Sequence, residues 1–280
     1  MARVAEAIGL DSIWLGDHLL YRDQRGSLGP WEVWSMLAAL AAVTERIELG
    51  PLVAATSFHN PGILAKKAAT IDEISGGRLV LGLGAGWNEV EYRAFGFPFD
   101  QRVSRFEEAF TIIRTLLREG RIDFDGRFYQ LRDCELLPRG PRAEGPPLMV
   151  GSTGERMLRI TMPHVQLWNA WYTAHQNRPE GIPALTEKVD AACRDVGRDP
   201  AEVRRTVAVF VRMSGGGGKR PSAYAEDERV GALSGDAETL AEGLRAYARA
   251  GIHEVQLVMD PITPASIEEL GPVLALLDRD

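Results

Sequence analysis

The sequence predicts an α/β protein, and a TIM-type (β/α)8 barrel is the architecture that fits it best. Short apolar runs of strand length alternate with segments of helical periodicity along almost the whole chain. Such alternation is typical of a parallel sheet whose outer face is covered by helices. The length of 280 residues also suits a single barrel, which typically needs about 250 residues. An open, doubly wound sheet is the alternative.

Seven predicted strands make up the sheet. They cover residues 12–16, 47–54, 78–82, 147–151, 165–170, 206–213 and 253–259. Residues 1–8 add no strand, because Val4, Ala5 and Ile8 recur at helical spacing and Gly9 ends the pattern. We therefore expect the chain to begin inside the first strand–helix unit, so that the first strand of the barrel is missing.

Helices are predicted between these strands. They cover residues 31–46, 60–75, 102–118, 182–196, 200–203 and 236–250, with further helices starting near residues 155 and 264. The second has the clearest boundaries, because Asn60 is a favourable N-cap residue and proline, here Pro61, is tolerated in a first turn. Gly76 and Gly77 end it, since glycine readily adopts the left-handed conformation that closes a helix.

One excursion interrupts what we expect to be a single domain over residues 1–280. It covers residues 121–145, where Asp125 and Gly126 stand between β-forming residues and predict a hairpin.

Residues 214–230 form a second irregular segment. Four consecutive glycines precede Lys219 and Arg220, a composition typical of a mobile loop. Such a loop either stays solvated or folds over an anionic ligand.

Composition and charge exclude several classes of function. Lysine and arginine number 32 against 39 aspartates and glutamates, a net charge of −7, and an acidic chain is poorly suited to bind nucleic-acid phosphates. We expect neither a membrane span nor a signal peptide, because no apolar run reaches roughly 18 residues. Two isolated cysteines and five scattered histidines make neither a disulfide scaffold nor a metal site. These features predict a cytoplasmic protein without nucleic-acid or membrane partners.

Candidate functional residues follow the strands, because barrel enzymes place their active sites at the carboxyl ends of the strands. Asp17 and His18 directly follow the first predicted strand. An imidazole can donate or accept a proton near neutral pH, and a neighbouring carboxylate can orient it. We predict that His18 and Asp17 are catalytic. The alternative is that Asp17 caps a turn and His18 is a solvated loop residue.

Two turns are candidates for ligand binding through their backbone. Gly84, Ala85 and Gly86 precede Trp87, and Glu89 occupies the position where a dinucleotide fingerprint needs a small residue. We expect this turn to approach a planar ligand closely, with Trp87 as an aromatic wall, although glycines also form plain sharp corners.

The second turn is Gly151, Ser152 and Thr153, which join a strand to a helix. Exposed N–H groups at a helix start, with two hydroxyls beside them, suit a phosphate. The alternative is that Ser152 or Thr153 simply caps the helix.

Taken together, these blocks resemble the luciferase-like monooxygenase superfamily, and within it the oxidoreductases that depend on the deazaflavin coenzyme F420. The blocks that carry the resemblance are SIWLGDH at 12–18, LAKKAATIDEISGGRLVLGLGAG at 64–86 and WNEVEYRAFGFPF at 87–99, with shorter ones at 47–53, 60–61, 126–131, 146–151, 167–169 and 264–277. The resemblance implies a TIM barrel that binds a flavin-type cofactor at the carboxyl ends of its strands, often as a homodimer.

The resemblance also implies roles for single residues. Asp17 and His18 match a pair that touches the deazaflavin ring, the histidine being a proposed proton donor or acceptor. Leu52 and Val53 match a bulge that often contains a non-prolyl cis peptide. The cofactor-binding residues expected on this basis are Asp17, His18, Leu52, Val53, Gly84, Ala85, Gly86, Trp87, Gly151, Ser152, Thr153 and Trp168; no metal is expected.

The sequence departs from the family at two positions that bear on the substrate and the cofactor. Trp87 stands where some relatives that oxidise sugar phosphates have an acidic residue, and their basic phosphate-binding cluster has no counterpart. The usual Ala-Asp-Gly before the aromatic residue of the sixth strand is replaced at residues 165–167. We therefore expect a small, uncharged organic substrate.

The predicted function is hydride transfer between coenzyme F420 and that substrate, with His18 giving or taking the accompanying proton. Two rivals stay open: an FMN-dependent monooxygenase of the same family, and a non-catalytic flavin-binding relative. An unrelated aldolase or metal hydrolase is disfavoured, because the chain lacks a suitably placed lysine or ligand cluster.

Overall fold

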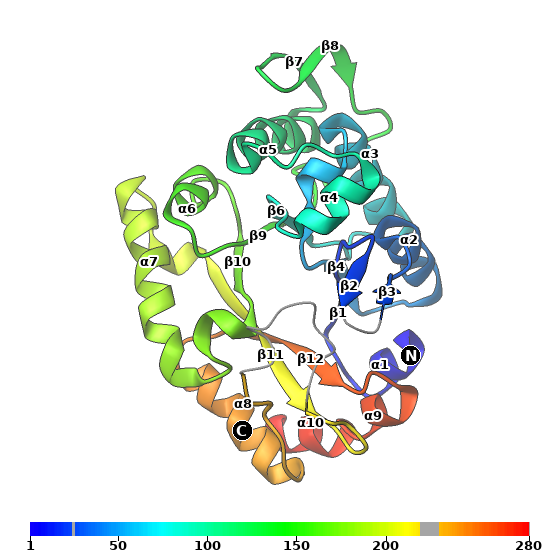
Figure 1. Cartoon of the computed structure of the whole chain (residues 1–280), viewed down its shortest axis with the longest axis vertical. Helices are drawn as coiled ribbons and strands as arrows, with labels where there is room; N and C mark the ends of the chain where they lie inside the picture. The colour runs from blue at the N-terminus through cyan, green and yellow to red at the C-terminus, as the bar shows by residue number, and fades with distance from the viewer. Residues whose placement is uncertain (24–25, 219–229, 280) are drawn as a thin grey trace. The chain divides into compact units, whose positions relative to one another are not determined.

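The structure is a computed structural model that describes residues 1–23, 26–218 and 230–279 (Figure 1). The chain divides into two compact units. The central unit is Trp14–Val150, and the terminal unit combines Met1–Ile13 with Gly151–Asp280. Much of the predicted loop 214–230, including Lys219 and Arg220, lies outside the described residues.

Short parallel strands organise the central unit. They are β4 (Glu48–Pro51), β5 (Ala54–Ala55), β6 (Leu81–Gly84) and β9 (Leu148–Gly151), and β1 (Ser12–Leu15) leads into the unit. β6 pairs in parallel with β5 and with β9. It is buried along its whole length, as expected for a parallel strand covered on both faces. The predicted strand 47–54 is split into β4 and β5 at Leu52 and Val53.

Three longer helices pack side by side in this unit. They are α2 (Val33–Val43), α3 (Pro61–Ile74) and α5 (Arg102–Glu119). α3 contacts both α2 and α5 (Figure 1). The predicted start of α3 is confirmed, because the Asn60 side chain accepts hydrogen bonds from the backbone N–H groups of Gly62 and Ile63.

Two elements of the central unit were not predicted. The segment after β1 contains a small antiparallel hairpin, β2 (Tyr21–Asp23) and β3 (Gly26–Leu28). A short helix, α4 (Glu89–Phe95), follows β6 and ends at Gly96, whose φ is +76°. Its seven residues bury only Glu91 and Tyr92, so the sequence of this helix has no apolar periodicity from which it could be predicted.

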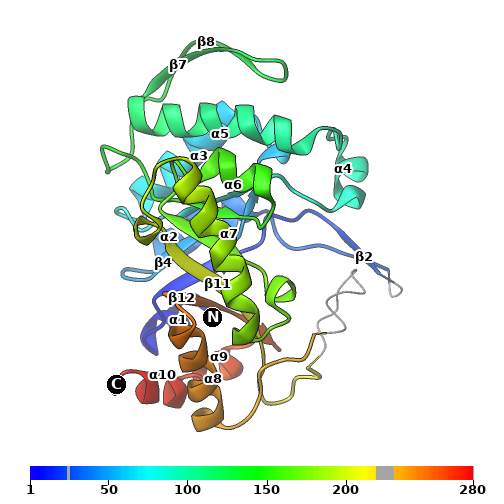
Figure 2. The same cartoon turned by 90° about the vertical axis from the view of Figure 1, so that its left-hand side faces the viewer.

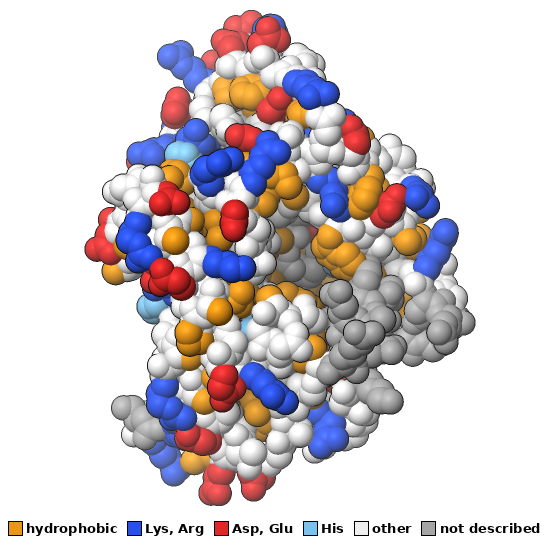
Figure 3. Space-filling view, turned by 60° about the vertical axis from the view of Figure 1, so that its left-hand side comes forward, with side chains coloured by type: hydrophobic (Ala, Val, Ile, Leu, Met, Phe, Trp, Pro, Cys, Tyr) orange, Lys and Arg blue, Asp and Glu red, His pale blue; other side chains and the backbone are white. Residues whose placement is uncertain are grey.

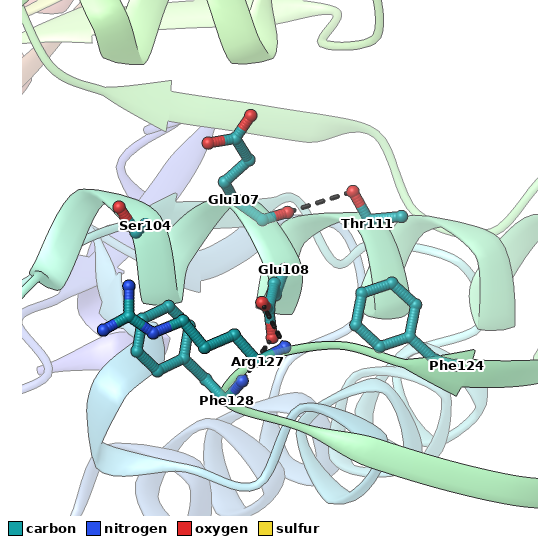
Figure 4. Close-up of a pocket in the computed structure, with 7 residues that line it drawn as sticks. All are labelled: Ser104, Glu107, Glu108, Thr111, Phe124, Arg127 and Phe128. Atoms are coloured by element: carbon teal, nitrogen blue, oxygen red, sulfur yellow. Dashed lines mark hydrogen bonds between the residues drawn. The ribbon is translucent and has the colours of Figure 1, made fainter.

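The predicted excursion is a hairpin, β7 (Arg121–Asp125) and β8 (Gln130–Glu135), in antiparallel pairing. Figure 2 shows it beside α5. Glu108 of α5 secures the hairpin tip, since its carboxylate accepts the backbone N–H groups of residues 127–129. A recess of about 390 Å³ lies between helix and hairpin (Figure 4). The Glu108 carboxylate, one of the groups that line this recess, is already engaged by the hairpin backbone.

The terminal unit contains a second set of parallel strands. They are β10 (Leu167–Ala170), β11 (Arg204–Arg212) and β12 (Glu254–Asp260), with β11 in the middle. Its α-helices are α1 (Ala2–Ala7), α6 (Glu155–Thr161), α7 (Ile182–Asp195), α8 (Ala237–Arg249), α9 (Pro264–Glu268) and α10 (Gly271–Leu277). The predicted helix 200–203 is only a 3₁₀ turn, Pro200–Glu202.

Buried polar side chains connect the three strands of the terminal unit. The Asn169 amide N–H₂ donates to Thr206 Oγ1 at 2.9 Å and to Gln256 Oε1 at 2.7 Å. All three residues are buried, so each bond satisfies a group that would be costly to leave unpaired.

Within the described residues, no helix is both long and apolar enough to cross a membrane. On the face drawn in Figure 3, acidic and basic side chains are interspersed.

Candidate functional site

The turn after β1 directs two adjacent side chains to different partners. Asp17 is buried, with 4% of its surface exposed. Its Oδ2 accepts the backbone N–H of Ala55 at 3.0 Å and lies 2.8 Å from His59 Nε2. His18, the next residue, instead contacts Glu91: its Nδ1 lies 3.0 Å from Glu91 Oε2.

This arrangement differs from the prediction in one respect. We expected Asp17 to be the carboxylate beside the His18 imidazole. In the structure Glu91 has that place, and Asp17 forms a separate pair with His59. The reason is tertiary structure, because Ala55 and His59, the partners of Asp17, follow β4, whereas Glu91, the partner of His18, lies on α4.

Glu91 is held as an acceptor by several donors at once. Its Oε1 accepts the backbone N–H groups of Leu19 and Leu20. Burial raises its pKa, but the hydrogen bond and charge of His18 and the two backbone N–H groups outweigh burial, so the pKa of Glu91 lies below its ordinary value. Glu91 is therefore ionised at neutral pH.

The two ring nitrogens of His18 have different surroundings. Nδ1 lies beside the Glu91 carboxylate, which can only accept a hydrogen bond while it is ionised. Within the described part of the chain, the contacts of His18 comprise Glu91 and the rings of Tyr21 and Trp87. The imidazole is thus fixed at one nitrogen and open at the other.

The glycine-rich turn lies next to Asp17 through strand pairing. Ala55, which donates to Asp17, stands opposite Gly84 in the parallel register of β5 and β6. The Tyr92 hydroxyl donates to the Ala85 carbonyl at 2.9 Å and fixes the turn. Gly86 has φ +74°, and a Cβ there would lie 2.0 Å from Tyr92 Oη. Only glycine fits this position without displacing Tyr92.

The peptide bond between Leu52 and Val53 is cis, as the resemblance implied. Both side chains are half-buried. Val53 Cγ1 would lie 3.0 Å from a Cβ built on Gly82, so Val53 packs against the bare backbone of β6.

Trp87 extends the site with an aromatic surface. Its side chain is 48% exposed, and its ring meets that of His18 edge-on at 5.6 Å. Tyr21 lies on the imidazole as well, with ring centroids 4.8 Å apart. The open imidazole is therefore bordered by two aromatic rings.

Four predicted site residues belong to the terminal unit. Gly151 ends β9, and Ser152 Oγ accepts the backbone N–H of Gly154 at 3.2 Å, while Thr153 lies between them. Trp168 is fully buried, and its Nε1–H donates to the Ser152 carbonyl at 2.7 Å. Trp168 thus fixes the turn from the core side.

The central unit brings together the other eight predicted residues, at the ends of β1, β4 and β6. Sequence reasoning missed two of their partners, Glu91 and His59. Glu91 had a usable signal, because Asn88 and Gly96 bracket a helix with suitable capping residues. His59 had none, because its pairing with Asp17 depends on tertiary structure. Among the described residues, no group of three acidic, histidine or cysteine side chains could hold a metal ion.

Known proteins resemble this chain in sequence and in fold. The family model described as luciferase-like monooxygenase matches residues 1–215. An F420-dependent glucose-6-phosphate dehydrogenase of Amycolatopsis mediterranei (strain U-32) is 29% identical over 218 residues, 73% of this chain and 61% of the relative. The pyrimidine monooxygenase RutA of Methylorubrum extorquens (strain PA1) is 32% identical over 297 residues, 98% of this chain and 76% of the relative. Two further curated relatives are matched over only 54% and 50% of their length.

A solved F420-dependent secondary alcohol dehydrogenase, in complex with an F420-acetone adduct, has a TM-score of 0.83 to this chain. The match covers 99% of this chain and 93% of that chain at 17% identity. It shows a shared fold, and the predicted α/β fold of the TIM-barrel type is confirmed. With the family model matching most of its length, the chain belongs to the luciferase-like monooxygenase family.

Proposed function

We propose that this chain is an oxidoreductase that uses coenzyme F420 to transfer a hydride to or from a small, uncharged organic substrate. The observation that carries the proposal is the His18 imidazole: a buried carboxylate holds its Nδ1, and no hydrogen bond to Nε2 comes from the residues that the structure describes. A proton must move when a carbonyl and an alcohol interconvert by hydride transfer, and such an imidazole is equipped to move it.

The residues of the central unit fit a flat ring system. Val53 and Ala85 are only half-buried, and Trp87 is exposed beside His18, so apolar surface and bare backbone are available to a planar ligand. A bound 5-deazaflavin supplies a carbon that accepts or releases a hydride. In this proposal Leu52, Val53 and the turn Gly84–Trp87 position the ring and exclude water.

The remaining site residues have supporting roles in the same proposal. Asp17 contacts the ring region while His59 and the Ala55 N–H hold its carboxylate. In the terminal unit, Gly151, Ser152 and Thr153 present backbone and hydroxyl donors to a phosphate, and Trp168 supports that turn through the Ser152 carbonyl.

Cofactor choice is tested by titrating the protein with F420 and, separately, with FMN, each followed by its own absorption and fluorescence. We expect F420 to bind at least about tenfold more tightly, a difference of about 1.4 kcal/mol, and to be oxidised or reduced by members of a panel of alcohols and ketones. Preferential binding of FMN, with oxygen consumption on reduction, would establish the rival monooxygenase activity. The similarity to a pyrimidine monooxygenase makes this the second candidate.

Replacing His18 with alanine tests the proton-transfer role. We expect turnover to fall by about 10²- to 10⁴-fold, the usual contribution of a general acid or base, while cofactor affinity changes by less than about tenfold. The matched control is His253→Ala, because His253 is exposed and lies in the terminal unit. Unchanged turnover in His18→Ala would remove His18 from the mechanism. Tight F420 binding without turnover by the unaltered protein would indicate a non-catalytic relative.

A further inference from the structure

Glu91 is the most deeply buried charged group near the candidate site. Its exposed fraction is 0%, and burying a carboxylate is costly unless donors compensate for the lost water. Its hydrogen-bond partners among the described residues are His18 Nδ1 and the backbone N–H groups of Leu19 and Leu20. None of these partners is an arginine or a lysine. The His18 imidazole is therefore the only side chain among them that can balance the negative charge of Glu91.

The two oxygens of Glu91 have different partners. Oε1 receives the backbone N–H groups of Leu19 and Leu20, and it holds the loop after β1 against α4. Oε2 is the oxygen nearer to His18 Nδ1, at 3.0 Å against 3.3 Å. Oε1 thus binds the backbone of the loop, and Oε2 binds the imidazole.

We propose that Glu91 is a positioning residue that fixes the Nδ1–H tautomer of His18 and thereby presents Nε2 as a proton acceptor. The proposal deepens the function proposed above, and its kinetic consequence rests on that function. When Nε2 takes up a proton, the Nδ1–H bond is kept, and the imidazolium that forms is paired with the carboxylate. When Nε2 releases the proton, the neutral Nδ1–H tautomer returns. The low pKa of Glu91 supports this assignment, because the carboxylate stays ionised throughout.

A single substitution separates this role from a structural one. In Glu91→Gln, the amide oxygen can take the place of Oε1 and keep the bonds from Leu19 and Leu20. The amide N–H₂ then faces His18 and must donate to Nδ1, because an amide nitrogen is only a donor. The neutral imidazole is thereby forced into the opposite tautomer, with its proton on Nε2. The loop stays attached while the proton changes its position.

The matched control is Glu89→Gln, which makes the same chemical change on the same helix. Glu89 is two residues away and exposed, and it pairs with Arg93 on the surface. It should leave the His18 tautomer unchanged.

Nitrogen-15 NMR of the imidazole tests the proposal without using activity. We expect the unaltered protein and Glu89→Gln to show a protonated Nδ1 and an unprotonated Nε2 in neutral His18, and Glu91→Gln to show the reverse. His18→Gln assigns the resonances. An Nε2–H tautomer in the unaltered protein would overturn the proposal, and this reading remains available if Glu91→Gln fails to fold. An unchanged tautomer in a folded Glu91→Gln would overturn it as well.

The pH dependence of kcat/KM adds a readout that a purely structural role would not move. The groups that face His18 are Glu91 of α4, Tyr21 of β2 and Trp87, and the Asp17 carboxylate is turned toward His59. Removing the charge of Glu91 disfavours imidazolium, so the acid limb of the profile should move to lower pH in the alcohol-oxidising direction. The plateau should fall at least tenfold with little change in KM. If the tautomer reverses but no F420-linked turnover occurs in any variant, the proposed function fails while this inference stands.

Discussion

At the end of β1, two neighbouring residues belong to two separate carboxylate–imidazole pairs. Asp17 pairs with His59, and His18 pairs with Glu91. Asp17 and His18 are adjacent in sequence, but tertiary structure gives each of them a partner from a different element. The identity of His18 and its place after a strand could be predicted, whereas the carboxylate that orients it is 73 residues away and could not.

Gly86 provides a test at the same scale. Replacing it with alanine forces a left-handed conformation, which costs roughly 1–2 kcal/mol, and also pushes a methyl group onto Tyr92 Oη, adding about 1–3 kcal/mol of overpacking. Gly96 has a similar φ of +76°, but a Cβ at that position would meet no described atom within 4 Å. Gly96→Ala should therefore lose only the free energy of the left-handed conformation and none from overpacking. Urea unfolding of both variants measures the difference. Equal losses of stability would show that Tyr92 does not restrict this turn.

At the scale of elements, a single arginine, Arg78, caps the C-terminal end of α2. All five N–H groups of Arg78 are used: Nε donates to the Ser75 carbonyl, and the Nη atoms donate to Ala41, Thr44 and Ile47. The acceptors include carbonyls at the C-terminal end of α2, which have no partner within the helix. Arg78 thereby joins the end of α2 to the end of α3.

Arg78→Lys should therefore be markedly destabilising although the charge is kept. A lysine has one nitrogen with three donors, and it cannot reproduce the planar fork. We expect a loss of about 2–4 kcal/mol, because buried carbonyls are left without donors. Urea unfolding measures it, with the exposed Arg93→Lys as a control that should stay within about 0.5 kcal/mol. A loss as small as that of the control would contradict the capping role.

The elements also show where sequence reasoning succeeds. All seven predicted strands are present among the described residues, because long-range burial leaves continuous apolar runs. β6 begins at Leu81 rather than at residue 78, and the residues just before it form only an isolated parallel bridge, between Leu79 and Leu49. The short helix α4 escaped prediction because it buries a glutamate and a tyrosine instead of an apolar stripe. Glu91, the carboxylate partner of His18, therefore lies on a helix that has no apolar periodicity in the sequence.

At the scale of the whole molecule, the two units differ in how they use histidine. In the central unit, His18 and His59 each face a carboxylate. In the terminal unit, His175 is 1% exposed and faces the Tyr247 ring, and its Nε2–H donates to the Ala208 carbonyl. Burial lowers the pKa of His175, although its backbone hydrogen bonds act in the opposite direction.

The terminal unit should accordingly lose stability on mild acidification. Because the pKa of His175 is lower in the folded chain than the ordinary value of about 6.5, the unfolded chain binds more protons below that pH. The contribution of His175 to stability is therefore complete above about pH 6.5 and is lost as the pH falls toward the folded value. Thermal unfolding between pH 7.5 and 5.5 should show a smaller decrease in Tm for His175→Asn than for the unaltered protein. Parallel decreases would contradict this assignment.

The proposed function requires a deazaflavin ring to bind in the central unit beside Nε2 of His18. A crystal structure of the protein with F420 tests it most directly. We expect the ring to lie against the Leu52–Val53 peptide and the turn Gly84–Gly86, with His18 Nε2 facing its reactive edge. A ring bound elsewhere, or turned so that His18 contacts only solvent, would contradict it.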